Sequence, residues 1–567
     1  MTDVEIIRRT ESLCPECLKQ IPAEFYVDPE TNWVMLRKTC KDHGEFKDKI
    51  AIDADEYKWQ KEFTNEIGST IDISTKPDST TSGIKCAENG CPYDCGICEN
   101  HQSAPCICLI DVTNRCNLTC PICFANASAK GYVVEPTFDQ IIQIMEHFRS
   151  MKPTPAVLLQ FAGGEPTLRD DLPEIIRRGK QMGFIETMVS TNGVRMGKSV
   201  EYCRELKEAG LDAVYLQFDA TDAPEIWKKV RGVNLWPLKK RVIENCREVG
   251  LHGVVLVPVI AKGVNDNQVG PILDFARDNT DVIVGVVFQP VSLCGRINYE
   301  ELMDLRYTTS DLKVDINKHT NDAIKHFYPI ATTAKFTQLL AWFDDVPAFS
   351  MISHHDCGFA TILISNENTG EWEPIENYFD ADGLIKFANK TWDMITKREA
   401  PRPTKMLNID LSKYGNILST IGNFVDDMTE IGYRQAMKAY FMAGLLRYIR
   451  NPAKIVTSKT FQSFAKLIFS PSLQTAGNFL QTRNILIAAM HFQDAYNFDL
   501  QRVKSCLVHY GLIDPDDPSK VLEVPFCAMN TVHRSRLERK LALVGVEAKK
   551  PEIIQSEIES LLSNLEK

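Results

Sequence analysis

The chain has 567 residues, which favours two to four domains, and its 44% hydrophobic and 25% charged residues are the proportions of an ordinary globular protein. A formal net charge of −11 argues against a basic surface for nucleic acid, so no nucleic-acid partner is expected. Apolar runs fall short of the roughly 20 residues of a membrane-spanning helix, and the N-terminus lacks the apolar core of a signal sequence, so a cytoplasmic protein is expected, with peripheral membrane contact left open.

The first segment, residues 1–64, is predicted to be a metal-binding ribbon. Residues 24–38 alternate between polar and apolar side chains like a short hairpin, and a turn with two soft ligands lies on either side of it. The candidate ligands are Cys14, Cys17, Cys40 and His43. Two such turns suit a tetrahedral metal, and either zinc or a mononuclear, rubredoxin-like iron fits the set.

Residues 65–106 are predicted to be a linker followed by a cysteine-rich segment. Ser, Thr and Gly dominate residues 65–85. Twelve of the 18 cysteines precede residue 124, a clustering that in a reducing compartment indicates metal more often than disulfides. An auxiliary [4Fe–4S] cluster is predicted on Cys91, Cys95, Cys98 and Cys106. A zinc site is the alternative, because four thiolates suit either metal.

Residues 107–330 alternate between apolar strands and amphipathic helices. The predicted strands are 107–113, 156–162, 184–190, 211–219, 251–260 and 282–291. Thr137 is a candidate helix N-cap, and Gly183, Gly210 and Gly250 stand where a left-handed residue ends a helix. Six such units predict a parallel sheet covered by helices, and an incomplete barrel and a doubly wound open sheet fit equally well. Cys203 and Cys246 lie in helical stretches and are interpreted as core residues.

Residues 331–567 are predicted to be mostly helical. Long segments with one apolar face cover 383–396, 415–450 and 458–492, and strand-like pieces occur near 359–365 and 520–526. Three isolated cysteines, Cys357, Cys506 and Cys527, stand in this otherwise cysteine-poor part. Composition alone is equally consistent with three buried core residues.

The sharpest motif follows the first predicted strand of the alternating region. Cys116-Asn-Leu-Thr-Cys120-Pro-Ile-Cys123 offers three thiolates in one loop, which can bind three irons of a [4Fe–4S] cluster and leave the fourth iron open. A closed structural site needs four ligands, so a zinc knuckle that lacks one ligand is the alternative. The motif resembles the radical S-adenosylmethionine (SAM) superfamily, in which SAM chelates the open iron.

Further motifs lie at the ends of the predicted strands, where parallel α/β folds place their sites. Strand two ends in Gly163-Gly164-Glu165, which resembles the GGE motif of the superfamily; Glu165 would accept from the SAM ammonium group. The resemblance also implies SAM contacts at Ser190, Asn192, Gln217, Asp219 and Arg231. A turn cap for Asp219 and a surface ion pair for Arg231 are the alternatives. The implied fold is α/β, a partial (βα)6 radical SAM barrel with an N-terminal metal-binding ribbon and a mostly α-helical C-terminal domain.

Nearly the whole chain resembles one archaeal group, on the runs CPYDCGICENHQSAPCICLIDVTNRCNLTCPICFA, QPVS-x-x-GR, HHDCGF and MHFQDAYNFDLQRVKSCLVHY. This group includes the tetraether lipid (GDGT and macrocyclic archaeol) synthases, and similar proteins are described as radical methyltransferases of 7,8-dihydro-6-hydroxymethylpterin. The resemblance implies three [4Fe–4S] clusters, SAM and a mononuclear iron. Cys357, Cys506 and Cys527 would hold the third cluster as catalytic ligands, with Cys294 as a candidate fourth ligand. His43 departs from the four cysteines of a rubredoxin site.

Radical coupling of the terminal methyl carbons of archaeal ether lipids, initiated by a 5′-deoxyadenosyl radical, is the leading expectation. It implies an ether phospholipid substrate and an external, ferredoxin-like one-electron donor. Predicted apolar helical faces at 417–448 and 461–492 would line a groove for the lipid chains. The alternative is radical C-methylation of the pterin in methanopterin synthesis. An iron–sulfur electron carrier or a zinc-ribbon scaffold is a further alternative, and the GGE motif argues against it because a carrier needs no SAM pocket.

Overall fold

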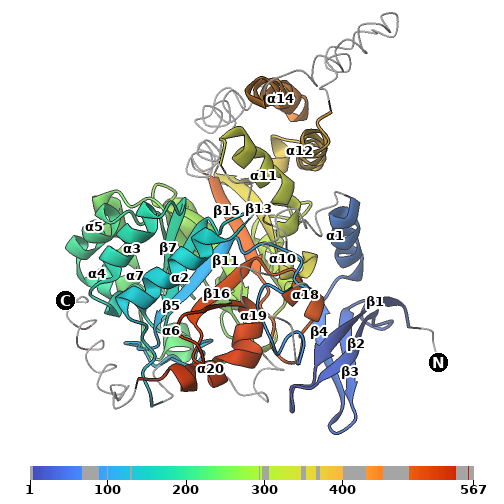
Figure 1. Ribbon diagram of the computed structural model, residues 1–567. Helices are drawn as coiled ribbons and strands as arrows, with labels where there is room; N and C mark the ends of the chain where they lie inside the picture. Colours follow the sequence, from blue (N-terminus) through green and yellow to red (C-terminus); the bar gives the residue numbers. More distant parts are fainter. Residues whose placement is uncertain are drawn as a thin grey trace, which may run out of the picture.

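The structure of the protein is a computed structural model (Figure 1). It describes residues 4–66, 89–98, 100–127, 131–152, 154–292, 294, 295, 305–346, 351, 353–365, 371–399, 430–450, 484–543, 560 and 563. The predicted linker from residue 67 on lies outside these residues, and so do residues 417–429 and 461–483 of the two predicted groove segments.

The N-terminal segment forms a four-stranded antiparallel sheet followed by a helix. Its elements are β1 (Ile6–Leu13), β2 (Gln20–Val27), β3 (Val34–Cys40), β4 (Gly44–Ala51) and α1 (Ala54–Glu66). The predicted hairpin is confirmed, because Ala23 pairs with Lys38 and Val27 pairs with Val34. Alternate residues such as Phe25 are buried in a core shared with α1, which is why the sequence alternates here.

Six parallel strands form the next unit, and each after the first is hydrogen-bonded to the strand that precedes it among the six. They are β5 (Ile107–Thr113), β6 (Leu158–Gly163), β7 (Glu186–Thr191), β8 (Ala213–Gln217), β9 (Val254–Val257) and β11 (Ile283–Pro290). A doubly wound sheet would reverse its order at a switch point, so the prediction of a partial barrel is confirmed and the open-sheet alternative is wrong. Pro258 ends β9, and the short β10 (Val259–Ile260) then pairs with β11.

Helices cover the outer face of these strands (Figure 1). They are α2 (Phe138–Ser150), α3 (Leu172–Gln181), α4 (Val194–Lys198), α5 (Val200–Glu208), α6 (Pro224–Arg231), α7 (Trp236–Val249) and α8 (Val269–Asp278). Thr137 caps α2 with a capping box, as predicted. The three predicted left-handed residues have φ of 85° at Gly183, 99° at Gly210 and 72° at Gly250.

The C-terminal part adds strands to both edges of the barrel sheet. β15 (Asn484–Met490) pairs in parallel with β11, and β16 (Val508–Ile513) pairs in parallel with β5. Beyond them lie β12 (Tyr328–Pro329), β13 (Gly358–Ser365), β14 (Trp372–Pro374) and β17 (Val521–Pro525). The connecting segment 491–507 therefore spans the open side of the six-stranded barrel. Strands from both sides of the domain boundary predicted at residue 330 share one sheet.

One secondary-structure prediction is wrong within the described residues. The helix predicted over 458–492 is replaced at its end by the strand β15. Ile485 and Ile487 belong to the core under the outer helices, and Ala488 belongs to a separate core. A short run that is buried on both faces has the same continuous apolar pattern in a strand and in a helix. The strands predicted near 359–365 and 520–526 are confirmed as β13 and β17.

The remaining helices lie in the C-terminal half. They are α10 (Thr309–His319), α11 (Ala334–Phe343), α12 (Ala381–Thr396), α14 (Glu430–Leu445), α18 (Leu500–Lys504), α19 (Phe526–Ala528) and α20 (Arg534–Leu541). Short helical turns are η2 (Pro166–Leu168), η3 (Asp266–Gln268), η4 (Ile330–Thr333), η5 (His355–Cys357), η6 (Ile375–Asn377), η9 (Leu446–Tyr448) and the π-helical η10 (Met529–His533). α11, α12 and α14 share a core of their own, at the top of Figure 1. None of the described helices is both long and apolar enough to cross a membrane.

Buried charges join the ribbon to the segment that spans the barrel opening. The guanidinium group of Arg306 lies 2.7 Å from the Asp48 carboxylate of β4 and 2.8 Å from the Asp494 carboxylate of the spanning segment. The Lys38 ammonium group of β3 donates to the Ala495 carbonyl at 2.6 Å. All three members of the Asp48–Arg306–Asp494 group are buried, so each depends on its partners for solvation.

Arg306→Leu should lower the free energy of unfolding by about 3–5 kcal/mol, because it leaves two buried carboxylates without their cation. Burial already raises the pKa of Asp48 to about 6. Removal of the Arg306 cation raises the pKa of Asp48 further, so the loss should shrink as the pH falls toward about 6, below which the carboxyl group is protonated in both proteins. Urea unfolding at pH 5 and pH 8 measures both effects.

The matched control is Arg204→Leu, which removes an exposed ion pair with Glu248 at 3.5 Å. It should cost less than about 1 kcal/mol and should show no such pH dependence. Equal losses for the two variants would contradict the role assigned to Arg306.

Candidate active site

The loop after β5 gathers three cysteines in one partly buried cluster. Cys116, Cys120 and Cys123 pack with apolar side chains that include Trp227 of α6. The Leu118 amide donates to the Cys116 sulfur at 3.4 Å. Burial raises the pKa of the Cys116 and Cys120 thiols, and the neighbouring thiolates raise it further. Three thiolates can share this space only if a cation compensates their charge.

The donor set of this loop fits an iron–sulfur cluster better than a single ion. Within the described part of the chain, these three sulfurs are not among the ligand groups whose atoms all lie within 4.8 Å of one another. The spacing is therefore wider than a single tetrahedral metal needs. Three thiolates on one loop suit three corners of a [4Fe–4S] cluster, with the fourth iron left for SAM.

Two glycines at the end of β6 let that strand approach the cysteine loop. A Cβ atom on Gly163 would lie 2.1 Å from the Thr113 carbonyl oxygen, and one on Gly164 would lie 2.2 Å from the Arg115 carbonyl oxygen. The Gly164 amide donates to the Thr113 carbonyl at 2.7 Å. Any side chain at these two positions would push the loop away from the strand. The glycines therefore allow the start of the cysteine loop to pack directly against the end of β6.

Glu165 is held by the protein itself. Its Oε1 accepts from the Thr167 amide at 3.1 Å, the Thr167 hydroxyl at 2.5 Å and the Thr191 hydroxyl at 2.6 Å, and its Oε2 accepts from the Asn192 amide at 2.7 Å. Burial raises the pKa of Glu165, and these donors oppose the shift. The carboxylate ties the ends of β6 and β7 together, and its bond to the SAM ammonium group stays a prediction.

The ends of β7 and β8 meet at a buried lysine. Lys239 of α7 donates to the Asn192 carbonyl at 2.6 Å and to Gln217 Oε1 at 3.0 Å, and the Asn192 side-chain amide donates to Asn117 of the cysteine loop at 2.7 Å. Lys239 is fully buried, which lowers its pKa to about 7. Sequence reasoning missed this residue, because a lysine in an amphipathic helix normally faces solvent. The Ser190 hydroxyl accepts from the Gln160 side-chain amide at 2.7 Å, and its SAM contact stays a prediction.

Asp219 and Arg231 form a two-point buried ion pair. Arg231 Nε lies 2.5 Å from Asp219 Oδ2, and Nη2 lies 2.8 Å from Oδ1. Arg231 Nη1 donates to the Ile122 carbonyl at 3.2 Å, and the guanidinium group also interacts with the Cys120 thiol. Arg231 is 7% exposed, so a surface ion pair is excluded. The pair anchors the cysteine loop to β8, and its positive end favours the thiolate form of Cys120.

The N-terminal ligand set is assembled as predicted. One donor atom from each of Cys14, Cys17, Cys40 and His43 lies within 4.8 Å of the others. The sulfurs of Cys14 and Cys40 each lie 3.5 Å from His43 Nδ1. The Asp42 amide and the His43 ring lower the pKa of Cys40 to about 6, which favours the thiolate that a metal binds. Four soft ligands in a closed set are typical of a structural zinc site.

A second cysteine group forms around the segment that spans the barrel opening. Cys506 lies close enough to Cys357 and Cys527 for their charges to interact, and burial raises its pKa to about 12. The buried guanidinium group of Arg502 interacts with Cys357 and Cys527. Cys294, the candidate fourth ligand, lies near Cys527. The structure therefore brings together the three isolated cysteines, and it adds a cation that sequence reasoning missed.

The predicted auxiliary set of four cysteines is only partly assembled. Cys91 and Cys95 are hydrogen-bonded neighbours, and Cys95 also interacts with Cys506 of the second group. Cys98 is buried. Cys106 lies elsewhere, in an apolar cluster where its sulfur contacts the Met351 sulfur at 3.6 Å. Its place just before β5 carries it into the core of the sheet, so the structure does not bring it to the other three.

Aromatic residues beside the two cysteine groups contact each other. The first group is Cys116, Cys120 and Cys123, and the second is Cys357, Cys506 and Cys527. Phe124 follows Cys123 in the chain, and Phe526 precedes Cys527. The two rings stack with their centroids 5.3 Å apart. A Cβ atom on Gly295 would lie 2.2 Å from the Cys123 carbonyl oxygen, which places the Cys294 turn against the same loop. The two groups are therefore neighbours in space.

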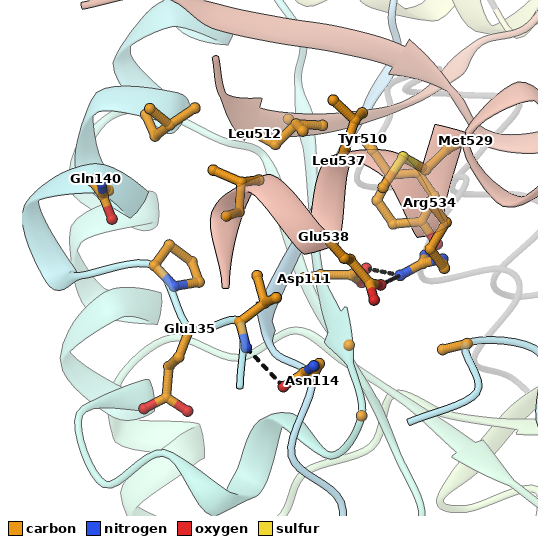
Figure 2. A pocket seen from close by; sticks show the side chains of 18 of the residues that line it. Asp111, Asn114, Glu135, Gln140, Tyr510, Leu512, Met529, Arg534, Leu537 and Glu538 are labelled. Atoms are coloured by element: carbon orange, nitrogen blue, oxygen red, sulfur yellow. Dashed lines mark hydrogen bonds and ion pairs between the residues drawn. The ribbon is translucent and has the colours of Figure 1, made fainter. Parts of the chain in front are cut away.

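A cavity of about 150 Å³ opens beside the cysteine loop (Figure 2). It lies between that loop, the end of β6, α2, β16 and α20, and most of its lining residues are apolar. Asp111, Arg534 and Glu538 supply its polar wall, and Arg534 and Glu538 are buried. Sequence reasoning missed this cavity, because its walls come from segments about 400 residues apart.

Comparison with protein families supports the reading of the barrel and of the ribbon. The radical SAM superfamily matches residues 110–276, and the HMPTM N-terminal zinc ribbon domain matches residues 6–52. A curated relative, the 7,8-dihydro-6-hydroxymethylpterin dimethyltransferase of Methanocaldococcus jannaschii, is 38% identical over 539 residues, 94% of this chain and 96% of the relative. The probable GTP 3′,8-cyclase of Methanococcus aeolicus is 31% identical over 222 residues, 37% of this chain and 67% of that protein.

A solved structure, that of Streptococcus suis SuiB bound to the precursor peptide SuiA, is also similar. It is 14% identical with a TM-score of 0.31, and the match covers 55% of this chain and 69% of that chain. The two family matches, not this structural likeness, cover the barrel with its cysteine loop and the ribbon with its four metal ligands.

Cys17→Ala should remove the N-terminal metal, because three remaining ligands leave the tetrahedral set open. Metal analysis of purified protein should show the loss of about one zinc per chain, with iron unchanged. Cys203→Ser, which alters a buried core cysteine, is the control and should keep both metals. A loss of iron in place of zinc would show that the ribbon holds iron.

Cys506→Ser should lower the iron content by about four atoms per chain, because it removes a ligand of the second cysteine group. Cys108→Ser is the matched control, since Cys108 is buried in the core of the sheet. Iron analysis and electron paramagnetic resonance of the reduced protein measure the change. An unaltered iron content in Cys506→Ser would mean that this group holds no cluster.

Proposed function

This chain belongs to the radical SAM superfamily and to the family of the archaeal 7,8-dihydro-6-hydroxymethylpterin dimethyltransferase, and we propose that it is a radical C-methyltransferase of a dihydropterin. The observation that carries the proposal is the 38% identity over 94% of this chain and 96% of that relative. Such a match takes in the ribbon, the barrel and most of the C-terminal part. It supports the pterin more directly than the lipid, because this relative is a pterin methyltransferase.

When bound, a reduced [4Fe–4S] cluster and SAM supply the one-electron chemistry that removes hydrogen from an unactivated carbon. The thiolates of Cys116, Cys120 and Cys123 would hold the cluster. Arg231 opposes the rise that burial causes in the pKa of the Cys120 thiol and, through Asp219, fixes the loop against β8. These contacts hold the cysteine loop in place before substrate binds, so the loop does not have to be ordered during the reaction.

The second cysteine group would hold an auxiliary cluster close to the substrate. Arg502 offsets the thiolate charge of Cys357 and Cys527 in a buried setting. Phe124 and Phe526 stack directly between the two groups, so little space separates them. An external one-electron donor of the ferredoxin type would serve these clusters, and zinc would occupy the ribbon.

A second candidate is the coupling of ether-lipid chains through their terminal methyl carbons. One observation favours it, the largely apolar lining of the cavity beside the cysteine loop. Hydrocarbon chains match such a lining, and peripheral contact with a membrane would then be needed to reach them. The size of the cavity favours the pterin, since about 150 Å³ holds one ring, whereas most of a long chain would lie outside it.

The decisive assay uses anaerobically reconstituted protein with dithionite, SAM and either 7,8-dihydro-6-hydroxymethylpterin or archaeal ether phospholipid. We expect pterin-dependent 5′-deoxyadenosine and a pterin heavier by one or two methylene units, both followed by mass spectrometry. Cys120→Ala should abolish both products, whereas the core variant Cys203→Ser should keep them.

Joined lipid chains together with an unchanged pterin would move the assignment to lipid coupling. SAM cleavage that neither compound stimulates would reject both substrates and would leave only the superfamily assignment.

A further inference from the structure

The cavity beside the cysteine loop lies where two parallel strands separate. β5 and β16 pair only from Ile107 with Val508 to Leu109 with Tyr510, although both strands continue beyond that point. The space between the diverging strands is closed by α2 on one side and α20 on the other (Figure 2). Its apolar walls include Ile144, Val134, Leu512, Met529, Leu537 and Leu541.

One buried cation in this wall has an unused donor. Arg534 is 7% exposed; its Nη1 donates to Asp111 at 2.6 Å and to Glu538 at 3.0 Å, and its Nε donates to Asn530 at 2.7 Å. Its Nη2 is buried, and no described residue accepts a hydrogen bond from it. The guanidinium carbon lies 5.0 Å from the centre of the Tyr510 ring. A buried donor without an acceptor costs free energy, which a ligand acceptor would recover.

The charges around the cavity select the kind of ligand. Asp111 and Glu538 bring two carboxylates against the single guanidinium group of Arg534. The carboxylate of Glu135, at the rim, is already held by Arg115 at 2.6 Å. The local excess of negative charge disfavours a phosphate or carboxylate ligand. It favours a neutral ring that presents N–H donors beside a carbonyl acceptor.

The position of the cavity relates it to the chemistry. Gly163 and Gly164 line it, as do Asn114 and Ala125, which flank the three cysteines of the first group. Met529, two residues after Cys527, lines the opposite wall. A ligand in the cavity would therefore contact the segments that carry both cysteine groups.

We propose that this cavity binds the aminopyrimidinone ring of the substrate, with Arg534 donating to the ring carbonyl and Asp111 accepting from its N–H groups. The inference rests on the proposed function, because it names the part of a dihydropterin that the site recognises. The volume of about 150 Å³ suits one ring, and the open side leaves room for the second ring and its hydroxymethyl group. Arg534 is then a specificity-determining residue, which no motif marks.

The test is anaerobic calorimetry of the reconstituted holoenzyme with 7,8-dihydro-6-hydroxymethylpterin and with its analogue that carries an oxo group in place of the 2-amino group. Arg534→Gln should weaken pterin binding about 10- to 100-fold. This is the change in Kd expected when one hydrogen bond to a charged group is lost. The analogue should bind the native enzyme more weakly by a similar factor. Arg539→Gln, an exposed residue of the same helix, is the matched control and should bind the pterin normally.

A second variant covers the case in which Arg534→Gln fails to fold. Leu543 lines the mouth of the cavity and is 41% exposed, so Leu543→Trp narrows the entrance without disturbing the core. It should weaken pterin binding about 10-fold or more while the iron content stays normal, which shows that the protein is folded and loaded. Normal pterin binding by the Leu543→Trp protein would then overturn the proposal.

The outcomes separate this inference from the proposed function. Methylation by the native enzyme together with unchanged pterin binding in Arg534→Gln would overturn the cavity assignment and leave the methyltransferase intact. Pterin binding that depends on Arg534 but yields no methylated product would support the cavity and overturn the methyltransferase. A native enzyme that neither binds nor methylates the pterin would overturn both.

Discussion

The pairing of two C-terminal strands with the two free edges of the barrel is the constraint on which the candidate site depends. Six parallel strands leave an open side, and β15 joins β11 at one edge while β16 joins β5 at the other. The segment 491–507 must then cross the opening. Arg502 and Cys506 lie on that segment, and Cys357 and Cys527 meet them there. The strand pairing thus assembles the second cysteine group beside the first.

Ion pairs and hydrogen bonds from the ribbon hold this crossing segment in place. Arg8 of β1 lies 2.7 Å from both the Asp356 and the Asp499 carboxylates, and Thr10 donates to Asp499 at 2.6 Å. Asp356 directly precedes Cys357, so the ribbon reaches to within one residue of a candidate cluster ligand. Thr10 and Asp499 are buried, and a metal bound in the ribbon would also stabilise the geometry of the barrel opening.

In both cysteine groups, a buried arginine lies close to the thiols. Arg231 faces Cys120, and Arg502 faces Cys357 and Cys527. A thiol in a desolvated site resists ionisation, yet only the thiolate binds iron. A fixed guanidinium group opposes that penalty before a cluster is present. Each arginine is in turn held by the protein, Arg231 by Asp219 and Arg502 by the His491 carbonyl, so the cation stays in place.

The sequence by itself determined the features that depend on neighbours along the chain. The spacing of Cys116, Cys120 and Cys123 predicts a three-cysteine loop, the two ribbon turns predict one metal site, and the βα alternation predicts the partial barrel. Each rests on residues that lie on one loop, one hairpin or one repeating unit, where short-range geometry leaves little choice. The resemblance to a known family pointed to the three isolated C-terminal cysteines, but not to the arginine among them. Only the tertiary structure decided that β15 is a strand, that Cys106 leaves the cysteine-rich set, and that Lys239, Arg502 and Arg534 are buried cations. These outcomes depend on contacts between segments far apart in the chain, where burial and strand pairing override the local pattern.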